Sequence, residues 1–347
     1  MTALAARPAP PPASVAEPDT FREAAAALKA RHAVGLEATG EVIVRHLDSS
    51  VALIPEVARH LIRAGGKRLR PLVTLAAAEA CGHRGEGDRL LAAAVELIHA
   101  ATLLHDDVVD DSALRRGLRT ANLVFGNKES VLVGDFLFAR AFELMVKTGS
   151  LRVLEVLSAA SCTISEGEVL QLQTQGNLAT DEGMYVEVIR AKTAALFGAA
   201  AQSAAALAGA DSAAERALTA YGLNFGIAYQ IVDDALDYAG EAEGLGKAAG
   251  DDFAEGKVTL PVILAARAAR DASERAFWHR TIEGGERREG DFETARRLIA
   301  RDRLVAASLD QARGYAEEAA AALAGLPPSP ALQALERLAL ASTLRES

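Results

Sequence analysis

The sequence lacks the features of a β protein, of a nucleic-acid-binding protein and of a disulfide-stapled domain. Only 5% of its residues are aromatic, and the alternation of apolar and polar residues that marks half-buried strands is absent. The formal net charge of −10 argues against a nucleic-acid partner, which needs a basic surface. The two cysteines, Cys81 and Cys162, lie far apart inside apolar helical patterns, so we expect two buried free thiols.

Membrane-spanning and targeting signals are also missing. No uncharged apolar run is long enough to cross a bilayer. The first twenty residues, MTALAARPAPPPASVAEPDT, are rich in Ala and Pro and lack the apolar core of a signal peptide. We therefore expect a disordered tail over residues 1–20 and a cytoplasmic protein, with peripheral membrane contact left open.

What the sequence does contain is apolar residues, mostly Ala and Leu, at helical spacing almost throughout. Glycine-rich breaks separate the periodic segments, and no linker divides the chain. Residues 21–347 are therefore expected to form one all-α domain. The pattern predicts helices over residues 21–48, 50–64, 69–81, 88–111, 127–147, 150–176, 181–209, 212–239, 257–270, 273–283, 291–324 and 329–345.

The stretch LLHDDVVDDSALRRG, residues 103–117, places four aspartates at the end of an apolar helix. Asp106 and Asp110 are four residues apart and share one helix face. At a helix C-terminus the macrodipole is already negative, so the cluster is unfavourable locally. A solvated acidic face is the plain alternative, but it does not account for crowding at this end. Magnesium, which binds carboxylate oxygens and substrate phosphates, accounts for it better.

A second acidic cluster, AYQIVDDALDYAG, repeats this pattern with Asp233 and Asp237. One such motif alone is weak evidence. Two of them, each at the end of an apolar helix, could face each other across one cavity and hold metal ions around a polyanion.

A polyanion also requires cations from the protein, and these lie beside the acids and the glycine-rich turns. Arginine suits bidentate phosphate contacts, and lysine acts as a movable point charge. His99, seven residues before Asp106, shares its helix face and is either a phosphate contact or a core residue. The basic residues are Lys67, Arg68, Arg70, Arg115, Arg116, Lys192, Lys247 and Lys257.

Together, these motifs resemble the trans-polyprenyl diphosphate synthase family, which elongates isoprenyl chains head to tail, and within it the long-chain octaprenyl and decaprenyl enzymes. The resemblance covers nearly the whole chain after the tail. It implies the all-α isoprenoid synthase fold with a central cavity, and a homodimer. It rests on GGKRLRP, ELIHAATLLHDDVVDDSALRRG, NLVFGNKESVLVGDFLFARAFEL, KTAALFGAA, AYQIVDDALDY and GKAAGDDFAEGKVTLPVIL.

The resemblance also implies a role for each matching residue. Three Mg²⁺ would be bound, two of them by Asp106 and Asp110 and the third by Asp233 with Asp237 in support. Asp107 and Asp111 are expected to support the ligands from behind or to face solvent. The diphosphate of isopentenyl diphosphate would be held by Lys67, Arg70, His99 and Arg116. The reacting carbons would be lined by Lys192, Thr193 and Gln230. The allylic diphosphate would be held by these three together with Arg115, Lys247 and Lys257.

In that family, ionisation of the allylic diphosphate produces a carbocation that alkylates the double bond of isopentenyl diphosphate. Closure of a lid around residues 240–257 would exclude water. Ala101 and Thr102, just before the first acids, are small and favour a long product such as a quinone side-chain precursor. We expect the helices at 127–176 to form the pocket floor and Ala101→Phe to shorten the product.

Three alternatives remain at this point. A short-chain farnesyl or geranylgeranyl diphosphate synthase differs only in product length. A terpene cyclase shares helices and an acidic motif but lacks the isopentenyl diphosphate site of GGKRLRP. A non-catalytic subunit of a heteromeric synthase would typically have lost one acidic motif, and this chain keeps both.

Overall fold

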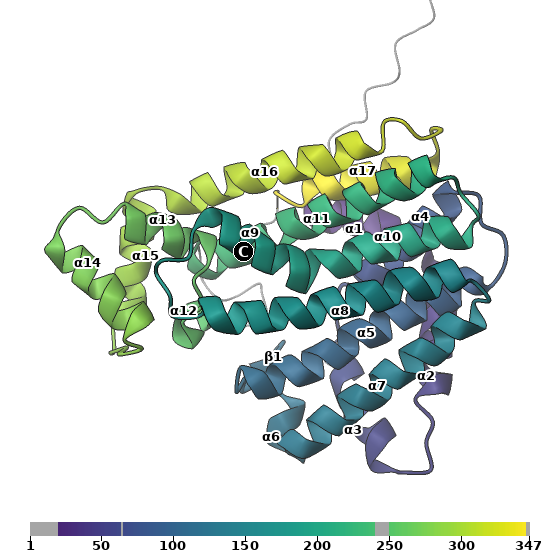
Figure 1. Ribbon diagram of the computed structural model, residues 1–347, viewed down its shortest axis with the longest axis horizontal. Coiled ribbons are helices and arrows are strands. Elements are labelled where there is room, and N and C mark those ends of the chain that lie inside the picture. The colour runs from purple at the N-terminus through teal and green to yellow at the C-terminus, as the bar shows by residue number, and fades with distance from the viewer. Residues whose placement is uncertain (1–19, 64, 240–249, 345–347) are drawn as a thin grey trace, which may run out of the picture.

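A computed structural model describes residues 20–63, 65–239 and 250–344 (Figure 1). The predicted tail over 1–20 therefore lies almost wholly outside the described residues, as do Lys247 and most of the predicted lid. The all-α prediction is confirmed, because helices make up most of the described part and its two strands are only two residues long each.

The first half of the chain forms a layer of helices that includes the long α5 and α7 (Figure 1). Its elements are α1 (Phe21–Arg31), α2 (Ala33–His46), α3 (Leu53–Arg63), α4 (Leu69–Ala80), α5 (Gly87–Val109), β1 (Leu114–Arg115), β2 (Leu118–Arg119), α6 (Ala121–Phe125), α7 (Asn127–Lys147) and α8 (Leu151–Thr174).

The second half completes the bundle and adds a group of shorter helices at one end of it, at the left of Figure 1. Its elements are α9 (Glu182–Ile189), the π-helical turn η1 (Arg190–Ala194), α10 (Ala195–Leu207), α11 (Ser212–Ala239), α12 (Asp251–Glu255), α13 (Leu260–Arg267), α14 (Ala272–Trp278), a second π-helical turn η2 (His279–Glu283), α15 (Asp291–Arg301), α16 (Leu304–Ala322) and α17 (Pro330–Ala341).

Several predicted helices are interrupted where the backbone leaves the helical region. The helix expected over 21–48 breaks at His32, and the one expected over 291–324 breaks at Arg303, whose φ of 57° is left-handed. The segment 112–126, read as a loop, contains the short β1–β2 hairpin and α6. Local backbone conformation at single residues is what helical periodicity does not detect.

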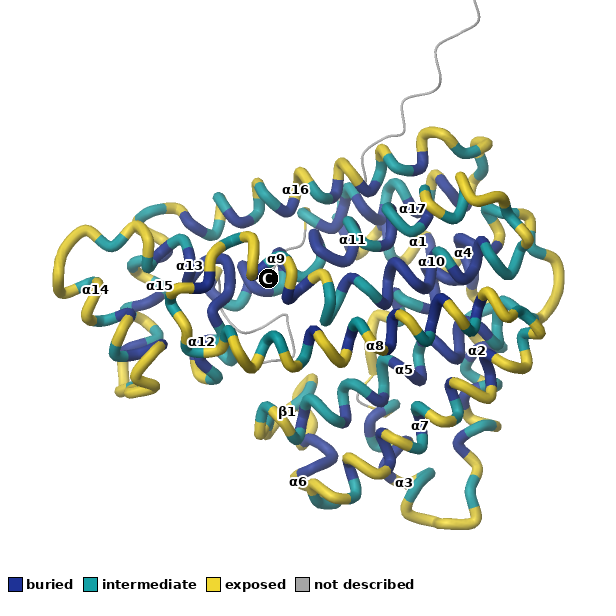
Figure 2. Tube along the Cα trace, viewed as in Figure 1, coloured by how far each residue is buried: buried dark blue, intermediate teal, exposed yellow. Residues whose placement is uncertain are grey.

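Two apolar clusters form the core, and α11 contributes to both of them. The long helix begins where the Asp211 side chain accepts hydrogen bonds from the backbone N–H groups of Ala213 and Ala214. It then packs closely on α10. The glycine at position 222 permits this approach, because a Cβ there would lie 2.3 Å from the Phe197 carbonyl oxygen. Figure 2 shows α4 and α10 as largely buried and α14 as largely exposed.

The expectation of two buried thiols is wrong. Cys81 is half-buried and Cys162 is exposed, and both are free. Cys162 lies on the outer face of α8, whose buried residues follow a different stripe of the helix. Among the described residues, no helix is both long enough and apolar enough to cross a membrane.

Candidate active site

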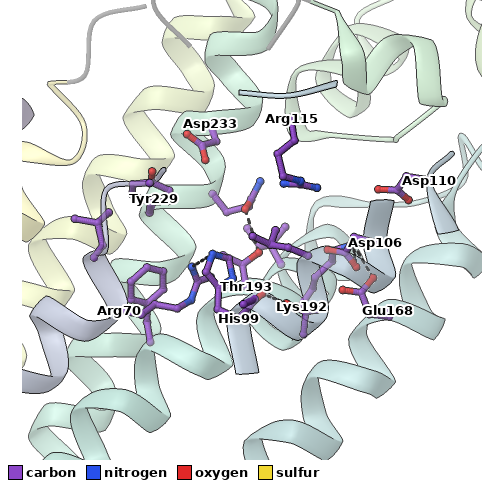
Figure 3. Close-up of a pocket in the computed structure, with 18 of the residues that line it drawn as sticks. Arg70, His99, Asp106, Asp110, Arg115, Glu168, Lys192, Thr193, Tyr229 and Asp233 are labelled. Atoms are coloured by element: carbon purple, nitrogen blue, oxygen red, sulfur yellow. Dashed lines mark hydrogen bonds and ion pairs between the residues drawn. The ribbon is translucent and has the colours of Figure 1, made fainter. Parts of the chain in front are cut away.

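A cavity of about 640 Å³ lies where α5 and α11 end, and both acidic motifs open onto it. Figure 3 shows Asp106 and Asp110 on one side of this cavity and Asp233 on the other. The predicted site residues that line it are Lys67, Arg70, His99, Thr102, Asp106, Asp110, Arg115, Arg116, Lys192, Thr193, Gln230, Asp233, Asp237 and Lys257.

Asp106 and Asp110 form the first acidic wall of the cavity. Two lysines from distant elements neutralise part of its charge. Lys257 Nζ lies 3.2 Å from Asp110 Oδ2, and Lys192 Nζ lies 3.9 Å from Asp106 Oδ1. Burial raises the pKa of Asp106, Lys192 opposes that rise and Asp110 adds to it. Burial lowers the pKa of Lys257, but three surrounding carboxylates outweigh it and raise the pKa above its ordinary value. This wall therefore carries carboxylates that a bound cation would stabilise.

Asp107 has a different role from its neighbour Asp106, because it is 1% exposed and does not line the cavity. Its Oδ1 accepts hydrogen bonds from Arg115 Nε at 2.8 Å and Nη2 at 2.6 Å. Asn122 donates to its backbone carbonyl at 3.0 Å. Asp107 thus holds Arg115 in place, while Asp111 is exposed and adopts a φ of 50°.

The two adjacent arginines lie on the β1–β2 hairpin, in which Leu114 pairs with Arg119 and Arg115 with Leu118. Arg116 and Gly117 form its two-residue turn, with φ angles of 54° and 78°. Positive φ at both turn residues is the type I′ geometry that suits hairpins. The Arg116 side chain reaches the loop before α4, where a Cβ at Gly66 would lie 2.7 Å from Arg116 Nη1.

A basic pole forms around the start of α4 and the middle of α5. Arg70 Nη1 donates to His99 Nε2 at 3.3 Å, and the Arg70 guanidinium lies 4.3 Å from the centre of the Phe197 ring. Burial, followed by Arg70, holds the pKa of His99 well below its ordinary value. The imidazole is therefore neutral, with Nε2 as acceptor and its proton on Nδ1. Lys67 lies over the rings of Phe21 and Tyr229.

Lys192 and Thr193 are presented by the π-helical turn η1 between α9 and α10. Two glycines make room for this turn. A Cβ at Gly167 of α8 would lie 2.7 Å from the Lys192 backbone nitrogen, and one at Gly226 of α11 would lie 2.6 Å from Ala194 Cα. Single π-helical turns occur often at functional sites. Here the wider turn directs both side chains into the cavity.

Glu168 of α8 is a site residue that sequence reasoning missed. Its Oε2 lies 2.6 Å from Lys192 Nζ, and burial, followed by the Asp106 charge, raises its pKa to about 7. The only signal in the sequence is a glutamate inside the apolar stretch ISEGEVLQL. By itself, such a residue is usually a surface charge.

Asp233 and Asp237, at the end of α11, form the second acidic wall of the cavity. Beside them runs a chain of side-chain hydrogen bonds. Thr193 Oγ1 donates to Gln230 Oε1 at 3.0 Å, and Gln230 Nε2 donates to Asp234 Oδ1 at 2.7 Å. Tyr185 donates its hydroxyl to Asp234 Oδ2 at 2.7 Å. Sequence reasoning assigned no role to Tyr185 or to Asp234. Their signals were the spacing of seven residues from Tyr185 to Lys192 and the place of Asp234 inside the acidic motif.

Asp237 accepts hydrogen bonds from the backbone N–H groups of Gly250 at 3.0 Å and Asp252 at 3.2 Å. It therefore anchors the start of α12 to the end of α11. Burial and the nearby Asp252 raise its pKa to about 7, although these two hydrogen bonds oppose the rise. The expected role of Asp237 in support of a metal ion stays a prediction.

The donor set of the two walls fits a hard divalent cation. Among the described residues, no three His, Cys, Asp or Glu side chains lie close enough together to form a metal site by themselves. Magnesium does not need such a cage, because it is usually bound through one or two carboxylates, with waters and substrate phosphates completing its octahedron. Asp106, Asp110 and Asp233 supply carboxylates from two sides of one cavity.

The two predicted chain-length residues differ in their position. Thr102 lines the cavity, whereas Ala101 is fully buried and does not. The apolar part of the lining comes largely from α2, α3 and α5, and includes Ile43, Leu47, Leu61 and Leu97. From the helices at 127–176, where the floor was expected, Leu137 is the apolar lining residue.

A helical bundle with two carboxylate-bearing helix ends facing one cation-lined cavity defines the isoprenoid synthase class. The model of the polyprenyl synthetase family matches residues 51–299, and the chain belongs to that family. The enzyme class expected from the motifs, a polyprenyl diphosphate synthase that transfers prenyl groups, is confirmed.

Individual relatives agree with this assignment. The octaprenyl diphosphate synthase of Escherichia coli (strain K12) is 45% identical over 88% of this chain and 94% of its own length. A polyprenyl synthase from Caulobacter crescentus CB15, crystallised with calcium and isoprenyl diphosphate, superposes with a TM-score of 0.90 at 51% identity, covering 93% of this chain and 98% of its own. A decaprenyl diphosphate synthase from Rhodobacter capsulatus has a TM-score of 0.88 at 50% identity, with 93% and 100% coverage.

Proposed function

We propose that the protein condenses isopentenyl diphosphate with an allylic prenyl diphosphate, repeatedly, to give a long-chain all-trans polyprenyl diphosphate. The observation that carries this proposal is the meeting of both acidic helix ends with a basic pole in one cavity. Such a cavity has room for two diphosphates, one at the basic pole and one between the acidic walls.

The basic pole suits isopentenyl diphosphate, whose diphosphate is not a leaving group. Arg70 and Arg116 offer guanidinium forks, Lys67 offers an ammonium, and the neutral His99 offers its Nδ1–H. None of these groups needs a metal ion to bind a phosphate. The partly apolar lining beside this pole accommodates the isopentenyl carbons.

The acidic walls suit the allylic diphosphate, which must leave. Asp106, Asp110 and Asp233 would hold Mg²⁺ with Asp237 in support, and we propose three ions. When bound, Mg²⁺ neutralises the diphosphate and stabilises the charge that develops on it as it leaves. Lys192 and Lys257 lie beside these carboxylates and add positive charge at the same place, while Arg115 is held ready by Asp107.

Chemistry then takes place between the two poles. The allylic C1–O bond breaks, C1 bonds to C4 of isopentenyl diphosphate, and the proton lost from C2 passes to the released diphosphate. Thr193 of η1 and Gln230 of α11 line the cavity. Their oxygen atoms suit the positive charge that develops on the allylic carbons. The longer allylic diphosphate that results is again a substrate.

The long product is supported by the small residues before Asp106 and by the relatives. The E. coli and R. capsulatus proteins carry the names octaprenyl and decaprenyl diphosphate synthase. We propose a product of this length, of the kind used for quinone side chains.

The test combines purified protein, Mg²⁺, farnesyl diphosphate and isopentenyl diphosphate, with the products identified by mass spectrometry. A series of longer diphosphates ending at eight to ten isoprene units is expected. A folded protein that does not elongate would defeat the proposal, and a cyclic hydrocarbon would favour a cyclase. Elongation that stops at three or four units would show a short-chain enzyme.

We also propose a homodimer. Large hydrophobic side chains are exposed along α6, α7 and α8, and Leu132 is 66% exposed. A second copy would remove them from water. Leu132→Glu should shift the protein to monomer in light scattering after gel filtration, and Val34→Glu, at an even more exposed site on α2, should not. The side chains concerned are Leu123, Val124, Val131, Leu132, Phe142, Val146, Leu151, Val169 and Leu172.

Peripheral membrane contact for product release is a further proposal, because a polyprenyl chain of this length is strongly apolar. Flotation with phospholipid vesicles tests it. Protein that floats only after turnover would support release at a membrane, and protein that never floats would contradict it. A cytoplasmic location stays a prediction of the sequence.

A further inference from the structure

The hydrogen-bonded chain behind Gln230 points to residues that control how the site presents its oxygen atoms. The chain runs from Tyr185 on α9 through Asp234 and Gln230 on α11 to Thr193 on η1. Its far end is almost fully buried, since Tyr185 is 4% exposed and Asp234 is 5% exposed. All four residues line the cavity, and Gln230 and Thr193 at the near end are the more exposed of them.

The direction of these hydrogen bonds is set by Asp234. Both oxygens of Asp234 act as acceptors, one from the Tyr185 hydroxyl and one from Gln230, so the group of Gln230 that faces Asp234 is the amide NH₂. The amide oxygen of Gln230 is thereby turned the other way, toward Thr193. Thr193 donates its only hydroxyl proton to that oxygen. The lone pairs of the Thr193 hydroxyl therefore remain available as acceptors. The near end of the chain consequently presents acceptors.

Tyr185 keeps Asp234 in this orientation. Gln230 and Asp234 are one helical turn apart on α11, but Tyr185 comes from α9 and donates to the second carboxylate oxygen at 2.7 Å. Each oxygen of Asp234 thus receives one donor, and rotation of the carboxylate would break both hydrogen bonds. Leaving a buried oxygen without its donor costs free energy, so the two-sided contact restrains the carboxylate.

We propose that Tyr185 and Asp234 are positioning residues that hold the Gln230 amide with its oxygen toward the cavity, where positive charge develops on the allylic carbons. This inference rests on the proposed condensation. Both residues are almost fully buried at the cavity wall, and their polar groups are used in hydrogen bonds within the chain. Each acts through Gln230, and a preorganised dipole stabilises developing charge without reorganising during the reaction.

A double-mutant cycle tests this dependence. Tyr185→Phe removes one hydroxyl and keeps the ring. We expect it to lower the single-turnover rate constant of the first condensation by about tenfold, with the KM values of both substrates nearly unchanged. In a Gln230→Ala background, which is itself slower, Tyr185→Phe should change that rate constant by less than about twofold, because the group it acts through is gone.

Tyr221→Phe is the matched control. Tyr221 is a fully buried tyrosine of α11 whose hydroxyl donates to the Leu335 carbonyl at 2.9 Å, away from the cavity. It should lower the melting temperature as Tyr185→Phe does and leave the rate constant unchanged. A merely structural Tyr185 would behave in the same way as this control.

Three outcomes would overturn the inference. Tyr185→Phe could leave the wild-type rate unchanged, it could slow the Gln230→Ala enzyme as much as the wild type, or it could raise KM in place of lowering the rate. If Tyr185→Phe does not fold, Asp234→Asn measured in both backgrounds replaces it, with the same expected loss of effect in Gln230→Ala. A wild-type enzyme without elongation activity would instead defeat the proposed function.

Discussion

At the scale of single residues, adjacent aspartates on α5 have opposite surroundings. Asp106 lines the cavity, while Asp107 is buried against Arg115. One step along a helix turns a side chain by about 100°, so neighbours in sequence face different environments. The acidic run therefore has two separate roles: Asp106 faces the cavity, where we propose the metal and diphosphate site, and Asp107 fixes an arginine.

Asp107→Asn tests the contact that fixes Arg115. The change keeps the shape of the side chain and removes the charge that pairs with Arg115. We expect the free energy of unfolding to fall by roughly 1.5–3 kcal/mol, the range for hydrogen bonds to charged groups, and the KM for the allylic diphosphate to rise while that for isopentenyl diphosphate changes little. Denaturant unfolding and steady-state kinetics measure these effects. Asp111→Asn, at an exposed neighbouring residue, is the control. It should leave the free energy of unfolding and both KM values nearly unchanged.

The two residues before the acids bear on product length. Thr102 lines the cavity, so Thr102→Phe should shorten the product, which chain-length analysis of labelled products would show. Ala101 is fully buried. Ala101→Phe is still predicted to shorten the product, and in addition to lower the free energy of unfolding by roughly 1–3 kcal/mol through overpacking. An unchanged product in both variants would contradict the role assigned to this turn of α5.

At the scale of elements, close contact between helices decides where Lys192 and Thr193 lie. The π-helical turn η1 is held between α8 and α11, and at each contact the neighbouring helix has a glycine. A side chain at either glycine would meet backbone atoms, which cannot move aside as the end of a flexible side chain can. The position of Lys192 and Thr193 in the cavity is thus set by two glycines, which have no side chain of their own.

Gly226→Ala should therefore damage both stability and activity. Its Cβ would lie 2.6 Å from Ala194 Cα and 2.8 Å from Ala194 Cβ. We expect a loss of roughly 1–3 kcal/mol in the free energy of unfolding, as for other overpacked sites, and a lower kcat as η1 shifts. Gly314→Ala, in the middle of α16 with nothing within 4 Å of the new Cβ, is the control. It should be neutral or slightly stabilising, because alanine favours helix.

At the scale of the whole molecule, the helices bring charges of both signs to one end of the bundle. Burial raises the pKa of Glu168 and of Asp237 to about 7, and in the unfolded chain both carboxyls return to ordinary values. The folded state thus holds protons that the unfolded state has already lost in the window between about pH 4 and 7. These two groups therefore favour the folded state at low pH, and that contribution is lost as the pH rises through 7.

A melting experiment on the metal-free protein checks this sign. The contribution of these groups should shrink as the pH is raised from about 5 to 8, and Glu168→Gln should weaken the pH dependence. Adding Mg²⁺ with inorganic diphosphate at pH 8 should raise the melting temperature, since a ligand that binds only the folded state stabilises it. Asp106→Asn should reduce that increase, and an increase that is the same in Asp106→Asn would contradict a metal site at this wall.

Most of the fold could be predicted because it depends on local periodicity. The helices expected over 127–147 and 212–239 begin and end at those residues, since their apolar stripes are continuous and their ends carry glycine or a capping residue. The breaks at His32 and Arg303 and the type I′ turn at Arg116 depend on single φ angles, which periodicity does not report. The burial of Cys162 was predicted wrongly because small and apolar residues occur on several faces of α8, so the sequence does not show which face is buried.

By itself, the sequence determined that the chain is helical, that carboxylates end two apolar helices, and that basic residues lie beside glycine-rich turns. Each of these follows from residue type and spacing along one element. Tertiary structure alone decided that Glu168 pairs with Lys192, that Asp107 holds Arg115, and that Tyr185 reaches Asp234 from another helix. These contacts join residues from separate elements, and only the packing of helix on helix determines which side chains meet.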